Sequence, residues 1–177
     1  MRRHVIVGSL GTMLGIGLPV TAAVAADATP TTGKESFRGV LIAGGKSGTR
    51  NVLSTFIVAD GVFSGHGRIV EVPNRPGDSD KVSRDDLVFP QGKLHLVSTN
   101  KSFALSVNPK TCAVRIAVRQ TARIQGGTGQ FLHATGTFTG GVQGRGVTFR
   151  NPDGTCSQRG ELLLEVDLVS ARGTISI

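Results

Sequence analysis

The sequence predicts an all-β domain, a single closed antiparallel up-and-down barrel of about eight strands, with a two-sheet β-sandwich as the alternative. From residue 36 onward, apolar and polar residues alternate with a period of two, in segments separated by clusters of Gly, Pro, Asn and Asp. No window of a dozen residues carries apolar side chains at helical spacing. Most connections are short, which favours antiparallel pairing of consecutive strands and therefore the barrel.

The first residues are typical of an export signal. Arg2 and Arg3 precede an apolar stretch over residues 5–20, and Ala23-Val24-Ala25 offers a cleavage site. The apolar stretch is short for a membrane-spanning helix and is interrupted by glycines, so an uncleaved anchor is the weaker alternative. We therefore expect a secreted protein with no membrane span after signal removal, exported by either the Sec or the twin-arginine route.

Three segments are expected along the chain. Residues 1–25 form the signal peptide, and residues 26–35 form a flexible leader, since they are polar, contain Pro and Gly and show no apolar period. Residues 36–177 have the length of one domain with one core, and we assign them to the barrel.

The expected strands follow from the alternation. In chain order they are residues 37–43, 52–59, 67–72, 94–99, 103–107, 113–124, 134–149, 161–169 and 173–177. Residues 73–86 are charged and poor in apolar side chains, and we expect a surface loop there.

Two strands allow their faces to be assigned. In residues 113–124 the apolar side chains alternate with Arg115, Arg119 and Arg123, so these arginines are expected on the outer face. In residues 161–169 leucine and valine are expected inside. Three acids of that segment are then expected outside: Glu161, Glu165 and Asp167. The barrel interior is accordingly expected to contain Phe, Leu, Ile and Val, and any pocket in it would suit an apolar ligand.

The chain contains two cysteines, Cys112 and Cys156. In an oxidising compartment the pair is expected to form a disulfide. The closed loop of about 45 residues corresponds to about 4 kcal/mol in the chain-entropy model. We expect the bridge to hold the glycine-rich turn of the next paragraph in register.

A glycine-rich motif lies between two expected strands. Its characteristic residues are Gly126, Gly127, Thr128, Gly129 and Phe131. Consecutive glycines permit positive φ at a tight connection, and Phe131 is expected to fold onto the barrel end as a plug.

This segment, together with Ile124 before it and Ala134-x-Gly136 after it, resembles the strand–turn–strand signature of the allene oxide cyclase and dirigent β-barrels. It is also similar to the corresponding segment of secreted bacterial proteins with that barrel. The resemblance implies the barrel fold. The plant enzymes of the group cyclise an epoxide or direct the coupling of phenolic radicals in cavities with buried polar and acidic groups. The acids of residues 161–167 are expected outside, while Glu71 and Asp60 have no assigned face, so the resemblance implies the barrel and leaves the activity open.

Composition narrows the function classes. The formal charge of +8 falls to +6 without residues 1–25, since two arginines and no acid are removed, and a basic protein attracts anionic partners. Trp and Tyr are absent, which disfavours carbohydrate platforms and single-stranded nucleic acid. No nucleophile motif, nucleotide-binding loop, cofactor motif or metal-ligand spacing is present, so we expect no cofactor and no metal, and catalytic residues stay unassigned.

Two functions remain open. The first is a non-catalytic binding module at or outside the cell surface. It would use Arg115, Arg119 and Arg123, spaced about 13 Å apart along one strand, on an anionic cell-surface polymer or lipid. Alternatively, those arginines form ion pairs with the acids of residues 161–167 and bind no partner. The second function is a barrel enzyme, cyclase- or isomerase-like, or a carrier for a small apolar molecule, and an open interior cavity would favour it.

Overall fold

The computed structural model describes residues 29–45, 50–157 and 162–177. Residues 1–28, which include the predicted signal peptide and the start of the leader, lie outside this range, as does Glu161. Within the described residues, the helical structure is one short 3₁₀ turn, and no helix there is long and apolar enough to cross a membrane.

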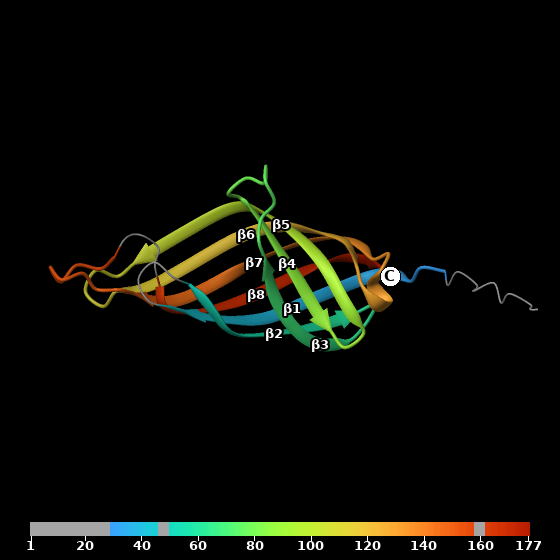
Figure 1. Cartoon of the computed structure of the whole chain (residues 1–177), viewed down its shortest axis with the longest axis horizontal. Helices are drawn as coiled ribbons and strands as arrows, with labels where there is room; N and C mark the ends of the chain where they lie inside the picture. The colour runs from blue at the N-terminus through green and yellow to red at the C-terminus, as the bar shows by residue number, and fades with distance from the viewer. Residues whose placement is uncertain (1–28, 46–49, 158–161) are drawn as a thin grey trace, which may run out of the picture.

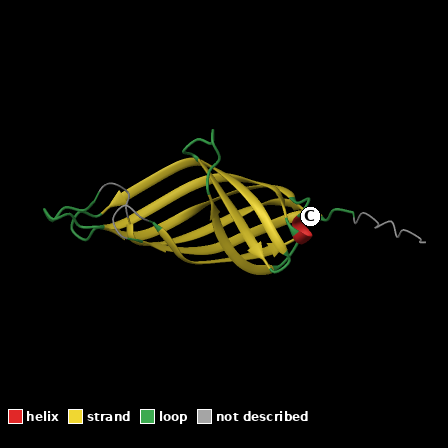
Figure 2. Cartoon of the chain, viewed as in Figure 1, coloured by secondary structure: helices red, strands yellow, loops and turns green. Residues whose placement is uncertain are grey.

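Eight strands form a closed antiparallel barrel in which each strand pairs with the next and β8 returns to β1, as Figures 1 and 2 show. The strands are β1 (Thr32–Gly44), β2 (Asn51–Gly61), β3 (Gly65–Val72), β4 (Val82–Phe89), β5 (Gly92–Val107), β6 (Ala113–Gly127), β7 (Thr135–Thr148) and β8 (Leu162–Ser176). The 3₁₀ turn η1 (Gly129–Phe131) lies between β6 and β7. The predicted fold class is confirmed, and the sandwich alternative is wrong.

Several predicted element boundaries were wrong. β1 begins at Thr32, inside the predicted leader, and pairs there with the last residues of β8. β5 runs through the expected break near Lys101 with a register shift, and β8 is one strand where two were expected. β4 occupies part of residues 73–86, where a loop was expected. The strand was missed because its Ser-Arg-Asp-Asp sequence has no apolar alternation.

One end of the barrel is filled by phenylalanine. Phe63 lies 4.9 Å from Phe131 and 5.1 Å from Phe89, measured between ring centroids, and Phe37 lies 5.1 Å from Phe138. η1 carries Phe131 into this cluster, where it is 1% exposed. The residues leading to Phe131 include glycines that no other residue could replace without strain. Gly129 has φ +60°, and a Cβ on Gly127 would collide with the carbonyl of Lys93. We call this the closed end.

The other half of the barrel is open on one side. β3 and β4 have 8 residues each, whereas β5 has 16. β2 and β3 pair at three positions, from Ile57 to Ala59 of β2, and then diverge. At the point of divergence the Thr55 hydroxyl replaces a backbone partner: it accepts from Ile69 N at 3.0 Å and donates to Ile69 O at 2.8 Å. The sheet therefore splits beside the interior.

The Cys112 to Cys156 disulfide is present, with the Cα atoms 5.3 Å apart. It joins the β5–β6 turn to the β7–β8 connection, at the end of the barrel opposite η1. The glycine-rich turn is separated from Cys112 by the whole of β6, about 45 Å at strand rise. The expectation that the bridge holds that turn in register was wrong, because the two features lie at opposite ends of β6.

Replacing Cys112 and Cys156 together with serine is expected to lower the free energy of unfolding by about 4 kcal/mol, because the unfolded chain regains the freedom of a long closed loop. For a domain of this size the melting temperature should fall by about 10 °C or more. Differential scanning calorimetry of the oxidised protein and the double variant checks this. A melting temperature within 2–3 °C of the parent would contradict it.

Candidate functional site

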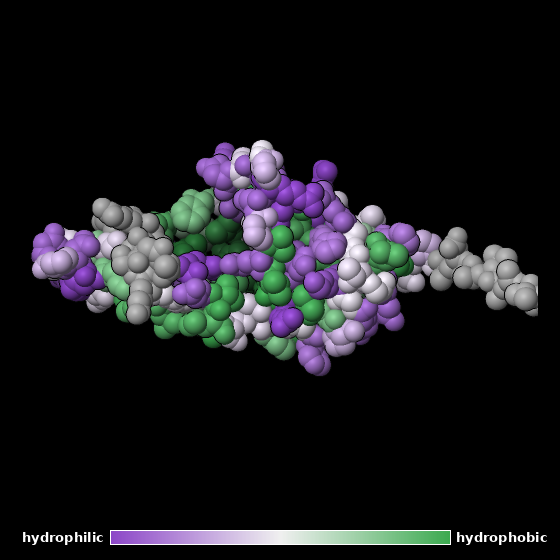
Figure 3. Space-filling view, in the orientation of Figure 1, coloured by the Kyte–Doolittle hydropathy of each residue, from purple (hydrophilic) through white to green (hydrophobic). Residues whose placement is uncertain are grey.

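A cavity of about 180 Å³ lies inside the barrel, between the phenylalanine cluster and the open end. Figure 3 looks onto the side where β3 and β4 stop short, and shows a hollow with hydrophobic atoms at its base and polar atoms beside it. The cavity is thus reached from solvent through the split in the sheet.

Most of the cavity wall is apolar. The walls come from strands all around the barrel, and the apolar side chains on them are Phe37, Leu41, Ile57, Ile69, Leu87, Leu96, Ala122, Phe138, Val142, Val169 and Ala171. Such a wall holds a hydrocarbon or aromatic group without any specific polar contact.

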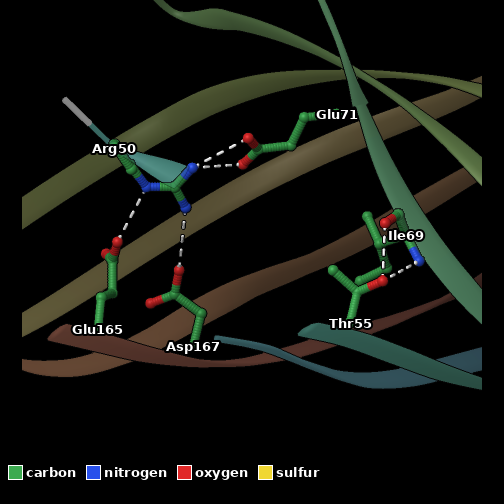
Figure 4. Close-up of polar contacts among 6 residues, drawn as sticks. All are labelled: Arg50, Thr55, Ile69, Glu71, Glu165 and Asp167. Atoms are coloured by element: carbon green, nitrogen blue, oxygen red, sulfur yellow. Dashed lines mark hydrogen bonds and ion pairs between the residues drawn. The ribbon is translucent and has the colours of Figure 1, made fainter. Parts of the chain in front are cut away.

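A charged cluster forms the polar side of the cavity, and Figure 4 shows its members converging on Arg50. Arg50 precedes β2. Its NH1 donates to both carboxylate oxygens of Glu71, at 2.7 and 2.9 Å, and its Nε donates to Glu165 at 3.1 Å. Its NH2 lies 3.9 Å from Asp167. Burial acts to lower the pKa of Arg50, but the hydrogen bonds that Arg50 donates to Glu71 and Glu165 outweigh it and raise that pKa. One guanidinium thus links β3 to β8 across the opening.

The predicted faces of β8 were inverted. Glu165 and Asp167 are buried inside, 7% and 8% exposed, while Leu164 and Leu168 are 46% and 56% exposed on the outer face. Alternation correctly grouped the acids together, but it does not say which group faces the core. On the neighbouring strand β1, Val40 stands opposite Leu168 and also faces outward, so apolar side chains lie side by side on the outer surface there. The expectation of an interior without acids was therefore wrong.

Asp85 of β4 also lines the cavity. It lies directly opposite Glu71 in the β3–β4 ladder, and the described residues provide it with no hydrogen bond or ion pair. Burial, followed by the charges of Glu71 and Asp86, raises the pKa of Asp85 to about 6. Two like charges directly opposite each other destabilise a sheet, and Arg50, which forms its ion pair with Glu71, offsets the effect on Asp85 only in part.

Asp167 is in a similar position. Burial, followed by the charge of Glu165, raises the pKa of Asp167 to about 6. Its buried Oδ1 accepts no hydrogen bond. That oxygen occupies the space where a Cβ on Gly144 would be, so residue 144 has to be glycine to accommodate it. The protonated form can donate to Glu165, whereas the ionised form leaves Oδ1 without a partner.

Ser98 adds a second unpaired polar atom. It is 1% exposed and its hydroxyl makes no hydrogen bond. Its neighbours across the strands, Ser83 and Ala122, both line the cavity. Buried polar groups almost always find a partner, so Asp167 Oδ1 and Ser98 Oγ are positions open to a hydrogen bond from a bound molecule or from water.

The candidate arginines Arg115, Arg119 and Arg123 are all exposed on the outer face of β6, and no ion pair to them occurs among the described residues. Arg145 of β7 stands opposite Arg115. The alternative that Glu165 and Asp167 neutralise this row is wrong, because those acids are inside the barrel and β7 separates β8 from β6.

Arg123, unlike Arg115 and Arg119, lines a groove of about 950 Å³ on the outer surface. Three further cations line the same groove: Lys34, Lys101 and Arg172. Threonine hydroxyls lie between them, in a row in which Thr139 stands beside both Thr121 and Arg172. The three arginines are thus divided between a groove and an open sheet face.

The glycine-rich turn is remote from both places. Gly126, Gly127, Thr128, Gly129 and Phe131 sit at the closed end, and none of them lines the cavity. Within the described residues, no group of three or more His, Cys, Asp or Glu side chains has the geometry to hold a metal ion.

Replacing Asp85 with asparagine should stabilise the barrel at neutral pH. A raised pKa means that the folded chain keeps a proton that the unfolded chain releases, so the stability from Asp85 is lost as pH rises from about 4 to about 6. The melting temperature of D85N should therefore exceed that of the parent at pH 7.5, and the difference should shrink at pH 4.5. Asp153→Asn is the matched control, since hydrogen bonds from Thr155 lower the pKa of this exposed carboxyl. A difference independent of pH would contradict the assignment.

Comparison of the chain with models of protein families, with curated proteins and with solved structures found no match. The likeness of the residue 124–136 segment to the allene oxide cyclase and dirigent barrels stays a prediction.

Proposed function

We propose that this protein is an exported binding barrel that holds a small, largely apolar molecule in its interior cavity. The observation that carries the proposal is a solvent-connected cavity with apolar walls, in which the buried Asp167 Oδ1 has no partner. The Ser98 hydroxyl, which is also unpaired, lies beside two residues of the cavity wall, Ser83 and Ala122. A bound molecule would supply both the apolar contacts and the missing hydrogen bonds.

The cavity volume sets the scale of the ligand. An engineered cavity of about 150 Å³ in another protein binds benzene, so about 180 Å³ suits a single-ring compound. A longer molecule could extend through the split between β2 and β3. The Cys112 to Cys156 disulfide supports an oxidising location outside the cytoplasm.

Fluorobenzene is a suitable neutral probe, observed by ¹⁹F NMR. We expect binding to the parent and its loss in Ala171→Leu, because Ala171 lines the cavity and the larger side chain fills it. The matched control is Ala117→Leu on the exposed face of β6, which should bind as the parent does. Thermal unfolding shows whether both variants are folded. Equal binding by folded A171L, or none by the parent, would refute the interior site.

The outer groove favours a second candidate function, the binding of an anionic cell-surface polymer. Its cations Lys34, Lys101, Arg123 and Arg172 face solvent together, with Asp60 as an opposing surface charge. Exposed charges are screened beyond about 8 Å at physiological ionic strength, so such binding should weaken with added salt.

Poly(glycerol phosphate) tests this candidate by titration at low and physiological salt. The double variant Arg123→Gln/Arg172→Gln should lose binding, while Arg115→Gln/Arg119→Gln removes the same charge outside the groove and should keep most of it. Both variants should keep the parent's stability within about 1 kcal/mol, since the side chains are exposed. Equal losses in the two variants would mean that net charge, and not the groove, attracts the polymer.

A further inference from the structure

We propose that the molecule bound in the cavity is a small organic cation, a protonated amine or amidine attached to an apolar body. This inference deepens the proposed function and rests on it, because it concerns the same cavity.

The charges in and beside the cavity do not balance. Among the described residues, four carboxylates lie there, and Arg50 is the cation that contacts them. The acids are Glu71, Asp85, Glu165 and Asp167. A buried charge needs a partner, so an excess of acid in a mostly apolar cavity calls for further positive charge.

Arg50 makes no hydrogen bond to the remaining acids, Asp85 and Asp167. Its closest contacts go to Glu71 and Glu165, and its distance of 3.9 Å to Asp167 is too long for a hydrogen bond. Asp85 has no partner among the described residues. Because the guanidinium is engaged by two carboxylates, it is also poorly placed to hold an anionic ligand.

The two under-satisfied acids come from opposite walls. β4 and β8 are four strands apart in a closed barrel of eight, so Asp85 and Asp167 face the cavity from opposite sides. Asp167 is 8% exposed and its Oδ1 has no donor. An ammonium group has three donors and an amidinium group four, enough to satisfy the carboxylate on either wall.

The rest of the cavity determines the kind of cation. Metal ions such as Ca²⁺ take six to eight oxygen ligands, whereas the wall beside these acids is built of Leu, Ile, Val and Phe side chains. An organic cation uses both surfaces, since its charged group meets the carboxylates and its apolar body meets the hydrocarbon wall.

The protonation of the two acids links binding to pH. Glu71, Asp86 and Arg50 act on Asp85, while Glu165, Glu71 and Arg50 act on Asp167. β5 and β7 present no titratable group to the cavity, since their lining residues are Leu96, Phe138, Gly140 and Val142. A cation binds the ionised acids, so its affinity should fall as pH drops from 7 to 5, while that of a neutral ligand should change little.

The experiment compares three compounds of similar size by isothermal titration calorimetry: 2-phenylethylammonium, 2-phenylethanol and phenylacetate. We expect the amine to bind at least tenfold more tightly than the alcohol at pH 7.5, and phenylacetate most weakly. Asp85→Asn and Asp167→Asn should each reduce amine affinity about tenfold and leave alcohol affinity unchanged. Asp153→Asn, on an exposed loop, is the control and should alter neither.

Binding of the alcohol by the two cavity variants shows that they are folded. If the alcohol binds the parent as tightly as the amine does, or if D85N and D167N leave amine affinity unchanged, the cation inference is refuted while the cavity function stands. If neither compound binds and fluorobenzene also fails, the proposed function itself is refuted.

Discussion

The ion pairs of Arg50 are the interaction on which the open half of the barrel depends. Glu165 is buried, and Glu71 projects from β3, one of the two shortest strands. Without the guanidinium, the buried Glu165 would lose its counter-charge, and removal of the partner from a buried carboxylate is strongly destabilising, whereas the pair with the half-exposed Glu71 contributes less. Arg50 also spans the gap between β2 and β3 that backbone hydrogen bonds leave open.

The distribution of charge follows from the same arrangement. The arginines of β6 and Arg172 of β8 lie on the outer surface, whereas the acids of β8 lie inside. A basic chain can therefore contain a locally acidic cavity, and the overall charge of +6 expected for the exported protein says little about the charge preference of a ligand that enters it. The outer and inner faces of one sheet can serve partners of opposite sign.

The sequence was sufficient for the fold class, since period-two alternation and turn residues determine strands, and short connections determine antiparallel order. It was insufficient for the cavity. Alternation groups Glu165 with Asp167 but leaves the face open, because the outward leucines of β8 are as regularly spaced as the inward acids. Asp85 could have been found from its distance to Leu87 and Phe89, because residues 85, 87 and 89 of a strand share one face and the last two are buried. Arg50 could not, because a single cation before a strand carries no signal about its partners.

The divergence of β2 from β3 has a consequence for contacts with other chains. A closed barrel has no free edge, but residues Asn51 to Ser54 of β2 pair with β1 alone among the described strands. An unpaired edge can accept a strand from another chain. Arg50 and Glu71 place opposite charges beside this short edge, and charged side chains at an edge oppose the addition of an apolar strand. The ion pair at the mouth of the cavity thereby also protects the protein against edge-to-edge aggregation.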